Sequence, residues 1–307
     1  QRIHGIARAG PVKLDAADLH AGFSSYGKLR EREARLYIVR VAHGARRLRH
    51  MVVRVKDRVG DAHRAVVIAA GNALDDQRRR DVAVLGVCRR HTGEQRRIIR
   101  AGSIPIVMGG DHSITLPELR AVAKRHGPVA LLHFDAHSDT GDDFFGKPYN
   151  HGTTFHWAIE EGLLLPEQST QAGIRGPLYS RSSLDYAKGK GMRVISGWEL
   201  HDIGVDETIR IMRERIRPGT PVFVTFDIAF LGAAYAPGTG TPEIGGFTTH
   251  EALKLILGVC PGQRLVGMDL VEVLPDTDSA GITSFAAAGI MHAFLACLAA
   301  NKKHNPS

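Results

Sequence analysis

The stretch that decides how this chain is interpreted is Leu131-Leu132-His133-Phe134-Asp135-Ala136-His137-Ser138-Asp139. An apolar run over 128–134 predicts a buried β-strand, and it leads directly into two carboxylates and an imidazole. In an extended chain, positions 135, 137 and 139 point to one side. Such groups repel one another or stay unsatisfied unless a cation lies between them, so the stretch predicts a metal site. A polar loop with acidic helix caps is the alternative, and it would be preferred for a single Asp-x-His pair.

Apolar runs alternate with helical patterns from Ala101 onward. We expect strands over 104–108, 128–134, 171–174, 193–195, 222–226 and 265–271. We expect helices over 116–126, 153–161, 182–188, 206–216, 249–257 and 284–300. Continuously apolar strands that alternate with helices are typical of a mostly parallel sheet covered on both faces. Ligands of such sheets bind beyond the carboxyl ends of the strands.

Two further strand ends carry groups of the same kind. His112 follows the strand over 104–108, and Asp227 follows the strand over 222–226. We therefore expect five ligands at one sheet edge: His112, Asp135, His137, Asp139 and Asp227. Mixed carboxylate and imidazole ligands suit Mn²⁺, Ni²⁺, Co²⁺, Fe²⁺ or Zn²⁺. The set is richer than one ion needs, which indicates two ions that share bridging carboxylates.

Six motifs together resemble the ureohydrolase family, which includes arginase, agmatinase, guanidinobutyrase and proclavaminate amidinohydrolase. They are Gly-Gly-Asp-His-Ser at 109–113, Asp-Ala-His-Ser-Asp at 135–139, His-Gly-Thr at 151–153, Ile-Arg-Gly at 174–176, Ala-Pro-Gly-Thr-Gly-Thr-Pro-Glu at 236–243 and Gly-Met-Asp-Leu-Val-Glu at 267–272. They occur in the family's order over residues 102–301. The run at 236–243 is more similar to agmatinase and its guanidino-acid relatives than to arginase.

The resemblance implies a three-layer α/β/α fold of the arginase/deacetylase type and hydrolysis of a linear guanidino compound to an amine and urea. It implies two Mn²⁺ ions, with Ni²⁺ as the alternative metal, and a hydroxide between them as nucleophile. One ion would be held by His112, Asp135, Asp139 and Asp227, and the other by Asp135, His137 and Asp227.

The resemblance also implies roles outside the ligand set. His151 would move a proton to the leaving amine, and Asp139 would take part in catalysis from its place at the first ion. Glu251, together with His151, would bind the substrate guanidinium. On sequence alone, a helix-end position is the better interpretation of His151 and Glu251.

The sequence departs from the family in ways that predict impaired hydrolysis. Ala229 stands where the family has a sixth ligand, an aspartate, so the second ion would be bound weakly. Leu231-Gly232-Ala233 replaces the usual Leu-Asp-Pro. His156-Trp157 replaces an arginine pair that follows Phe155 in agmatinases. The alternative to an impaired enzyme is a catalytically weak or inactive subunit that associates with an active homologue.

The first 100 residues match none of these motifs. They contain 23 Lys and Arg against 10 Asp and Glu, a net charge of +13, whereas the remaining 207 residues contain 17 against 22, a net charge of −5. We expect strands over 36–41, 65–70 and 82–87, separated by Arg- and His-rich stretches. We therefore divide the chain into an atypical or out-of-frame N-terminal part, 1–100, and a metal-binding α/β domain, 101–307. A basic nucleic-acid-binding arm is the least favoured alternative, because few aromatic residues are available to stack on bases.

Composition excludes several classes of protein. Cys88, Cys260 and Cys297 are too far apart in sequence for a disulfide framework or a thiolate zinc site, so we expect a reduced, cytoplasmic protein. No run of about 18 apolar residues is present, and we expect no membrane insertion. The expected partner is a small cationic guanidino substrate, with no nucleic acid and no membrane. The family resemblance implies a homo-oligomer, a trimer or a hexamer, with a hetero-oligomer as the alternative.

Overall fold

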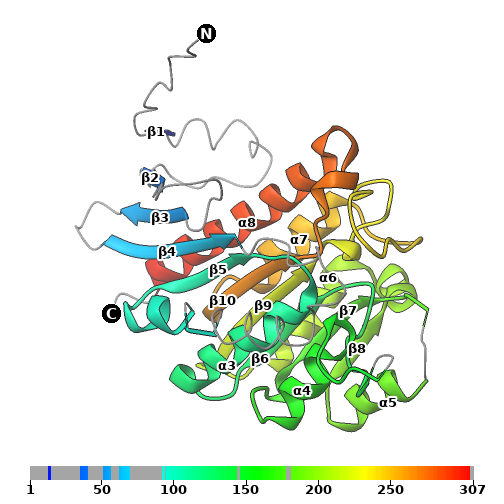
Figure 1. Cartoon of the computed structure of the whole chain (residues 1–307). Helices are drawn as coiled ribbons and strands as arrows, with labels where there is room; N and C mark the ends of the chain where they lie inside the picture. The colour runs from blue at the N-terminus through cyan, green and yellow to red at the C-terminus, as the bar shows by residue number, and fades with distance from the viewer. Residues whose placement is uncertain are drawn as a thin grey trace.

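The computed structural model describes the backbone of four short strands in the first third of the chain and almost all of the chain after residue 91. The described residues are Lys13–Leu14, Arg35–Arg40, Met51–Lys56 and Ala62–Ala69, followed by 92–93, 95–143, 146–177 and 181–304. The described part forms one sheet with helices on both of its faces (Figure 1).

The strands are β1 (Lys13–Leu14), β2 (Arg35–Arg40), β3 (Met51–Lys56), β4 (Ala62–Ala69), β5 (Ile104–Met108), β6 (Ala130–Phe134), β7 (Thr170–Ile174), β8 (Arg193–Ser196), β9 (Pro221–Asp227) and β10 (Arg264–Val271). Their order in the sheet is β1-β2-β3-β4-β5-β10-β9-β6-β7-β8. All neighbours from β4 to β8 pair in parallel. β1 to β4 pair antiparallel with one another at one edge. The prediction of a mostly parallel sheet is therefore confirmed.

The six strands expected after residue 101 all form, and β5 has the predicted bounds. In the first third, β2 and β4 match the runs predicted at 36–41 and 65–70, whereas β3 was not predicted. The strand predicted at 82–87 and the Arg-rich stretches lie outside the described residues. β4 pairs in parallel with β5, from Ala65 opposite Ile104 to Ala69 opposite Met108. The first third therefore contributes backbone to the same sheet as the metal-binding domain.

The helices are α3 (Thr115–His126), α4 (Thr154–Glu160), α5 (Arg181–Gly189), α6 (Gly197–Arg215), α7 (Thr249–Val259) and α8 (Ile282–His304). The prediction for α6 was wrong at its start, which lies nine residues before 206. Ser196 caps this earlier start by accepting a hydrogen bond from Glu199 N. Gly204 then breaks the helical geometry with φ 80°, so the periodic pattern becomes visible only after it.

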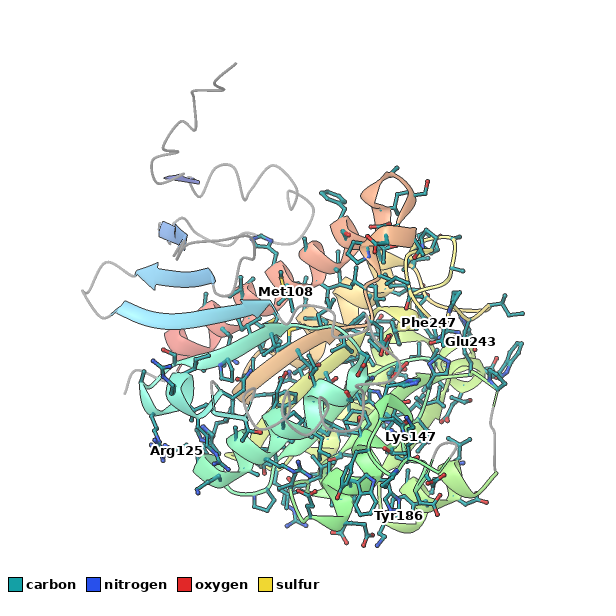
Figure 2. All side chains as sticks on the ribbon, in the orientation of Figure 1. Met108, Arg125, Lys147, Tyr186, Glu243 and Phe247 are labelled. Carbon is teal, nitrogen blue, oxygen red and sulfur yellow. The ribbon has the colours of Figure 1, made fainter. Side chains whose placement is uncertain are left out.

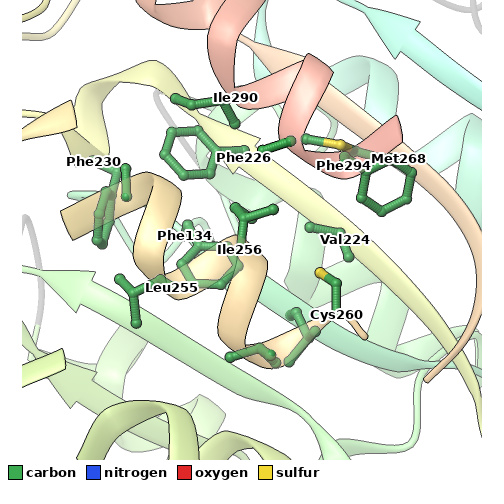
Figure 3. Close-up of a cluster of buried hydrophobic side chains, with 14 of the residues drawn as sticks. Phe134, Val224, Phe226, Phe230, Leu255, Ile256, Cys260, Met268, Ile290 and Phe294 are labelled. Carbon is green, nitrogen blue, oxygen red and sulfur yellow. The ribbon is translucent and has the colours of Figure 1, made fainter. Parts of the chain in front are cut away.

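Side chains of the central strands alternate between two cores. On one face, Leu132 and Val224 pack in a cluster with residues of α6, α7 and α8. On the other face, Leu131 and Phe223 pack with residues of α3, α4 and α5. Figure 3 shows the first cluster, in which aromatic side chains from β6 and β9 meet α7 and α8. Burial on both faces is the reason that these strands are continuously apolar.

By length and composition, one helix among the described residues could cross a membrane. It spans Ser279–Asn301 with a mean hydropathy of 1.8 and contains most of α8. Ile290, Phe294 and Cys297 of this helix are buried in the first cluster, against α7 and the sheet. The apolar window of this helix is 39% buried, and its buried side chains are those that cover the sheet.

The parallel strands direct their carboxyl ends to one edge, and the candidate site lies there. Figure 2 labels Met108 at the end of β5 and Glu243 in the segment between β9 and α7, on the same side of the sheet, with Arg125 at the opposite side. The strand order places β9 between β10 and β6. The segments that follow β5, β6 and β9 can therefore meet at one place.

Candidate metal centre

Four of the five predicted ligands meet at the ring of His112. This histidine begins the 3₁₀ turn η1 (His112–Ile114), which follows β5. Its Nδ1 lies 3.2 Å from Asp135 Oδ2, 3.0 Å from Asp139 Oδ2 and 3.3 Å from Asp227 Oδ2. All four side chains are at least nine-tenths buried. The structure therefore brings together His112, Asp135, Asp139 and Asp227 as the sequence predicted.

The local backbone explains how residues of one short segment reach this point. Asp135 directly follows β6, and Asp139 has φ 51°, a left-handed conformation that is uncommon for residues other than glycine. The segment bends at Ala136 and His137 and is left-handed at Asp139, instead of continuing as the extended chain that the sequence suggested. Asp227 is the last residue of β9, so its position is fixed by the sheet.

The other ring nitrogen of His112 points away from the cluster. His112 Nε2 lies 2.8 Å from Thr225 Oγ1, and Thr225 in turn contacts the buried carboxylate of Asp269. Thr115 Oγ1 also donates to Asp269 Oδ2 at 2.6 Å. If Thr225 donates to Asp269, its oxygen accepts the Nε2 proton of His112, and Nδ1 keeps a lone pair directed at the carboxylates.

This geometry fits a divalent cation. Among the described residues, none forms a hydrogen bond with His112 Nδ1, although the atom is buried and three carboxylate oxygens surround it. A buried polar atom without a partner is costly, and three carboxylates at one point need a positive charge. Nitrogen and oxygen donors in this combination suit a transition-metal ion.

The pKa values indicate how strongly the cluster needs positive charge. Burial alone would lower the pKa of His112, but the close carboxylates of Asp135, Asp139 and Asp227 raise it well above its usual value. Burial and the charge of Asp135 raise the pKa of Asp227 to about 7. Burial acts downward on His137, yet contact with Asp135 raises its pKa to about 10. The cluster therefore retains protons that a bound metal ion would displace.

The fifth predicted ligand, His137, belongs to a more open half of the cluster. Its ring is 24% exposed, and its Nδ1 lies 3.4 Å from Asp135 Oδ1. Its Nε2 lies 3.3 Å from Glu243 Oε1, a contact that the sequence did not predict. Asp135 therefore stands between the two halves, with Oδ2 facing His112 and Oδ1 facing His137.

Ala229, where the family resemblance implied a sixth ligand, lies two residues after Asp227. It is 1% exposed, in the 3₁₀ turn η4 (Ile228–Phe230) directly after Asp227. Its backbone N–H donates to Asp227 Oδ1 at 2.7 Å, which orients that carboxylate, but its methyl group cannot bind a metal. Among the described residues, the second half therefore has His137, the shared carboxylates and the Glu243 carboxylate beside His137.

His151 lies in a segment that contacts the metal cluster. It is exposed and begins the 3₁₀ turn η2 (His151–Thr153), which Asn150 caps. Thr154, which starts α4, donates its hydroxyl to the carbonyl of His112 at 3.2 Å. The segment that carries His151 is therefore anchored to the backbone of His112.

The structure gives Glu251 a task that differs from the predicted one. Its Oε2 accepts hydrogen bonds from the backbone N–H and the hydroxyl of Thr248, both at 2.8 Å, and Thr248 Oγ1 accepts from Glu251 N. This reciprocal capping box starts α7. The alternative weighed for Glu251, a helix-end residue, is the arrangement that the structure contains.

The sequence reasoning missed several polar residues around the ligands. His133, Gln171, Thr225 and Asp269 are all fully buried inside strands. Glu272, which follows β10 with φ 64°, accepts a hydrogen bond from His112 N at 2.7 Å. A polar residue within an otherwise apolar strand was the available signal, because such a residue must find a partner inside the protein.

Comparison with known proteins identifies the family. The arginase family model matches residues 37–297. A guanidinopropionase from Pseudomonas aeruginosa is 42% identical over 289 residues, which cover 94% of this chain and 85% of that protein. A guanidinobutyrase from the same organism is 43% identical over 205 residues, which cover 67% of this chain and 64% of that protein.

The fold has solved relatives as well. The structure of proclavaminate amidino hydrolase from Streptomyces clavuligerus superposes with a TM-score of 0.68 at 40% identity and covers 71% of each chain. The family match begins at residue 37, whereas the sequence motifs alone placed its start near residue 102. With a matched region that includes every metal-cluster residue, this chain belongs to the arginase family.

Proposed function

We propose that this protein hydrolyses a linear guanidino compound to an amine and urea in a metal-dependent reaction. The observation that carries the proposal is the buried cluster of three carboxylate oxygens within 3.3 Å of His112 Nδ1. The named relatives, a guanidinopropionase and a guanidinobutyrase, support guanidino compounds as the substrate class.

We propose Mn²⁺ as the metal, with Ni²⁺ as the alternative, because the donors are carboxylates and imidazoles without sulfur. His112, Asp135, Asp139 and Asp227 would hold the first ion, and His137 with the shared carboxylates the second. When bound, the metal acidifies water and thereby supplies the hydrolytic nucleophile near neutral pH. Because Ala229 offers no donor, the second ion would be held weakly and hydrolysis would be slow.

Substrate recognition would use carboxylates at the edge of the cluster. Glu272 is better placed than Glu251 to face a guanidinium, since Glu272 contacts His112 whereas Glu251 caps α7. A carboxylate and a guanidinium can form a pair of charge-assisted hydrogen bonds. His151, on the anchored segment before α4, would hand a proton to the leaving amine.

A urea-release assay tests the proposal. Purified full-length protein is stripped with a chelator, reloaded with Mn²⁺ or Ni²⁺, and incubated with agmatine, guanidinobutyrate, guanidinopropionate or arginine. We expect urea from at least one substrate with metal and none from the stripped protein or from Asp135→Asn. No urea from any guanidino compound with either metal, in protein that retains a bound ion, would contradict the proposal.

The buried methyl group of Ala229 favours a second candidate function. In this alternative the chain is a catalytically weak or inactive subunit that binds an active homologue. Ala229→Asp separates the two functions. Increased urea release in the variant supports an impaired enzyme, whereas unchanged inactivity with two bound ions supports a non-catalytic subunit.

Assembly and location are further proposals. We propose a homo-oligomer, a trimer or a hexamer, with a hetero-oligomer as the alternative, located in the cytoplasm. Light scattering of the purified chain tests the assembly: a mass near 33.4 kDa, that of a single chain, would contradict it. Fractionation of cells that express the full gene tests the location.

A further inference from the structure

Two buried polar side chains on neighbouring strands lie directly behind the metal cluster. His133 of β6 and Gln171 of β7 are opposite one another in the parallel register, and both have no exposed surface. The His133 ring packs on Phe155 at 4.3 Å between ring centres and meets the edge of His112 at 5.2 Å. Because burial of an imidazole and an amide is costly, their hydrogen bonds must matter to the site.

A backbone carbonyl fixes the orientation of the Gln171 amide. Gln171 Nε2 lies 2.6 Å from the carbonyl oxygen of Ser138, in the ligand segment between β6 and η2. A carbonyl oxygen only accepts hydrogen bonds, so the amide group that faces it must be the NH₂. The reversed amide would bring two oxygens together. The Gln171 Oε1 atom consequently faces no hydrogen-bond donor among the described residues.

The same NH₂ group determines which nitrogen of His133 carries the proton. Gln171 Nε2 lies 3.0 Å from His133 Nδ1, so its second hydrogen donates to Nδ1. A protonated Nδ1 would place two donors against each other. Nδ1 is therefore the acceptor, and the proton of the neutral ring is on Nε2. His133 Nε2 lies 2.9 Å from Asp135 Oδ2 and donates to it.

This assignment decides between two roles for His133. His112, His133 and Asp135 lie close enough together to hold one ion by proximity alone. A histidine ligand needs a lone pair toward the metal, whereas His133 directs an N–H at Asp135. Asp135 Oδ1 is meanwhile held by the backbone N–H of His137 at 2.9 Å. Both oxygens of the shared carboxylate thus accept a hydrogen bond, Oδ2 from His133 and Oδ1 from the backbone of His137.

We propose that Gln171 locks His133 in the Nε2–H tautomer and that His133 thereby positions the Asp135 carboxylate for metal binding without being a ligand itself. Gln171 and His133 are thus positioning residues of the metal site. This inference rests on the proposed function. The lock extends from Ser138 through Gln171 and His133 to Asp135, so the ligand segment helps to orient its own first carboxylate.

The tautomer is measured first, in metal-free full-length protein, by NMR of nitrogen-15-labelled histidine side chains. The His133 signals are identified by their loss in His133→Phe. We expect one tautomer with the proton on Nε2 in the wild type and a mixture in Gln171→Met, which keeps the volume but has no donor. A wild-type ring protonated on Nδ1 would overturn the proposal. This readout needs neither metal nor activity, so a failure of the proposed function leaves it interpretable.

Metal affinity is measured next, with Mn²⁺ in equilibrium dialysis. We expect Gln171→Met and His133→Phe to weaken binding about 10–100-fold, the usual cost of losing a partner of a metal ligand. Gln168→Met is the matched control, because Gln168 is also buried but its Oε1 pairs with Arg217 N and Thr220, away from the cluster. The proposal would be contradicted if the Mn²⁺ affinity of Gln171→Met were unchanged, or if Gln168→Met lowered the affinity by the same factor.

Direct ligation by His133 is tested with cadmium-113 as the bound metal. We expect scalar coupling between the metal and His112 Nδ1 and none to His133. Coupling to His133 would make it a ligand and overturn the proposal. A wild-type tautomer on Nε2 with no coupling to His133 supports it, whether or not urea is released.

Discussion

The two halves of the metal cluster share the Asp135 carboxylate but differ in almost everything around it. On the first half, His112 is 1% exposed, three carboxylate oxygens lie within 3.3 Å of its Nδ1, and its Nε2 is held by Thr225. On the second half, His137 is 24% exposed and contacts one oxygen of Asp135 and one of Glu243. Ala229, next to the shared Asp227, carries a methyl group in place of a ligand.

The two halves differ in how far their ligands are oriented before a metal ion binds. Around His112, every ligand is buried, and outer partners orient His112, Asp135 and Asp227 before an ion arrives, so binding costs little reorganisation. Around His137, the ring is partly solvated, and we infer that the methyl group of Ala229 leaves one donor missing. We infer that the cluster is a strong site next to a weak one. The predictions below run from the largest expected effect to the smallest.

Removal of the shared carboxylate should weaken metal binding at both halves of the cluster. Asp135→Asn keeps the shape but loses the charge that both halves use, so we expect Mn²⁺ affinity to fall by at least about 100-fold, beyond the usual cost of losing an outer partner. Metal content after dialysis measures this. Asp206→Asn is the control, because Asp206 is 82% exposed and pairs with Lys254. Retention of one tightly bound ion in Asp135→Asn would refute the shared role.

Loss of one imidazole should affect the two halves unequally. His112→Asn should lower affinity for the first Mn²⁺ ion about 100-fold or more, whereas His137→Asn should leave it within about threefold. The reason is that His112 contacts three of the predicted ligand carboxylates, whereas His137 contacts only Asp135 among them, and Glu243 in addition. Isothermal titration of the stripped variants gives both values. Equal losses would show that the halves are not distinct.

A donor placed at position 229 should convert the weak half into a second site. In Ala229→Asp we expect affinity for the second Mn²⁺ to rise about 10–100-fold and urea release to increase. Without metal the new carboxylate is buried and uncompensated, so the melting temperature should fall and Mn²⁺ should restore it. Ala229→Asn controls for volume. If Ala229→Asp still binds only one Mn²⁺ ion per chain, the account of the missing ligand is contradicted.

Metal binding should depend on pH because protons compete for the same atoms. The pKa of Asp227 is raised to about 7 in the metal-free protein, so this carboxyl is protonated below that pH and must lose its proton to bind. His112, whose pKa is raised well above its usual value, must lose a proton as well, so affinity for the first ion should fall with decreasing pH by about tenfold per pH unit for each released proton, most steeply below pH 7. Titrations at several pH values measure the slope. Affinity that stays constant between pH 5 and pH 7 would rule out this competition.

The parts of the site that the sequence predicted are those set by strand ends. Asp135 and Asp227 sit directly where buried apolar runs stop, and parallel strands bring such ends to one edge regardless of side-chain detail. His112, after the Gly-Gly turn that follows β5, was found in the same way. The positions of most strands and helices could also be predicted, because they follow from the periodicity of apolar residues in the sequence.

The parts that were missed depend on pairing between strands and on local capping. Gln171 acts on His133 because β6 and β7 place them opposite one another, a register that no local pattern encodes. Glu251 was assigned to substrate by resemblance, although Thr248-Thr249-His250-Glu251 carries the T-x-x-E pattern of a capping box. The left-handed backbone at Asp139 was missed because no glycine marks it, although aspartate adopts this conformation more often than most residues do.

The number of ions held per chain tests the central claim most directly. Wild-type protein is dialysed to equilibrium against increasing free Mn²⁺, and bound metal is measured against protein concentration. The account predicts a plateau at one ion per chain, followed by a second ion only at free Mn²⁺ concentrations at least about tenfold higher. Two ions bound together with equal affinity would contradict it.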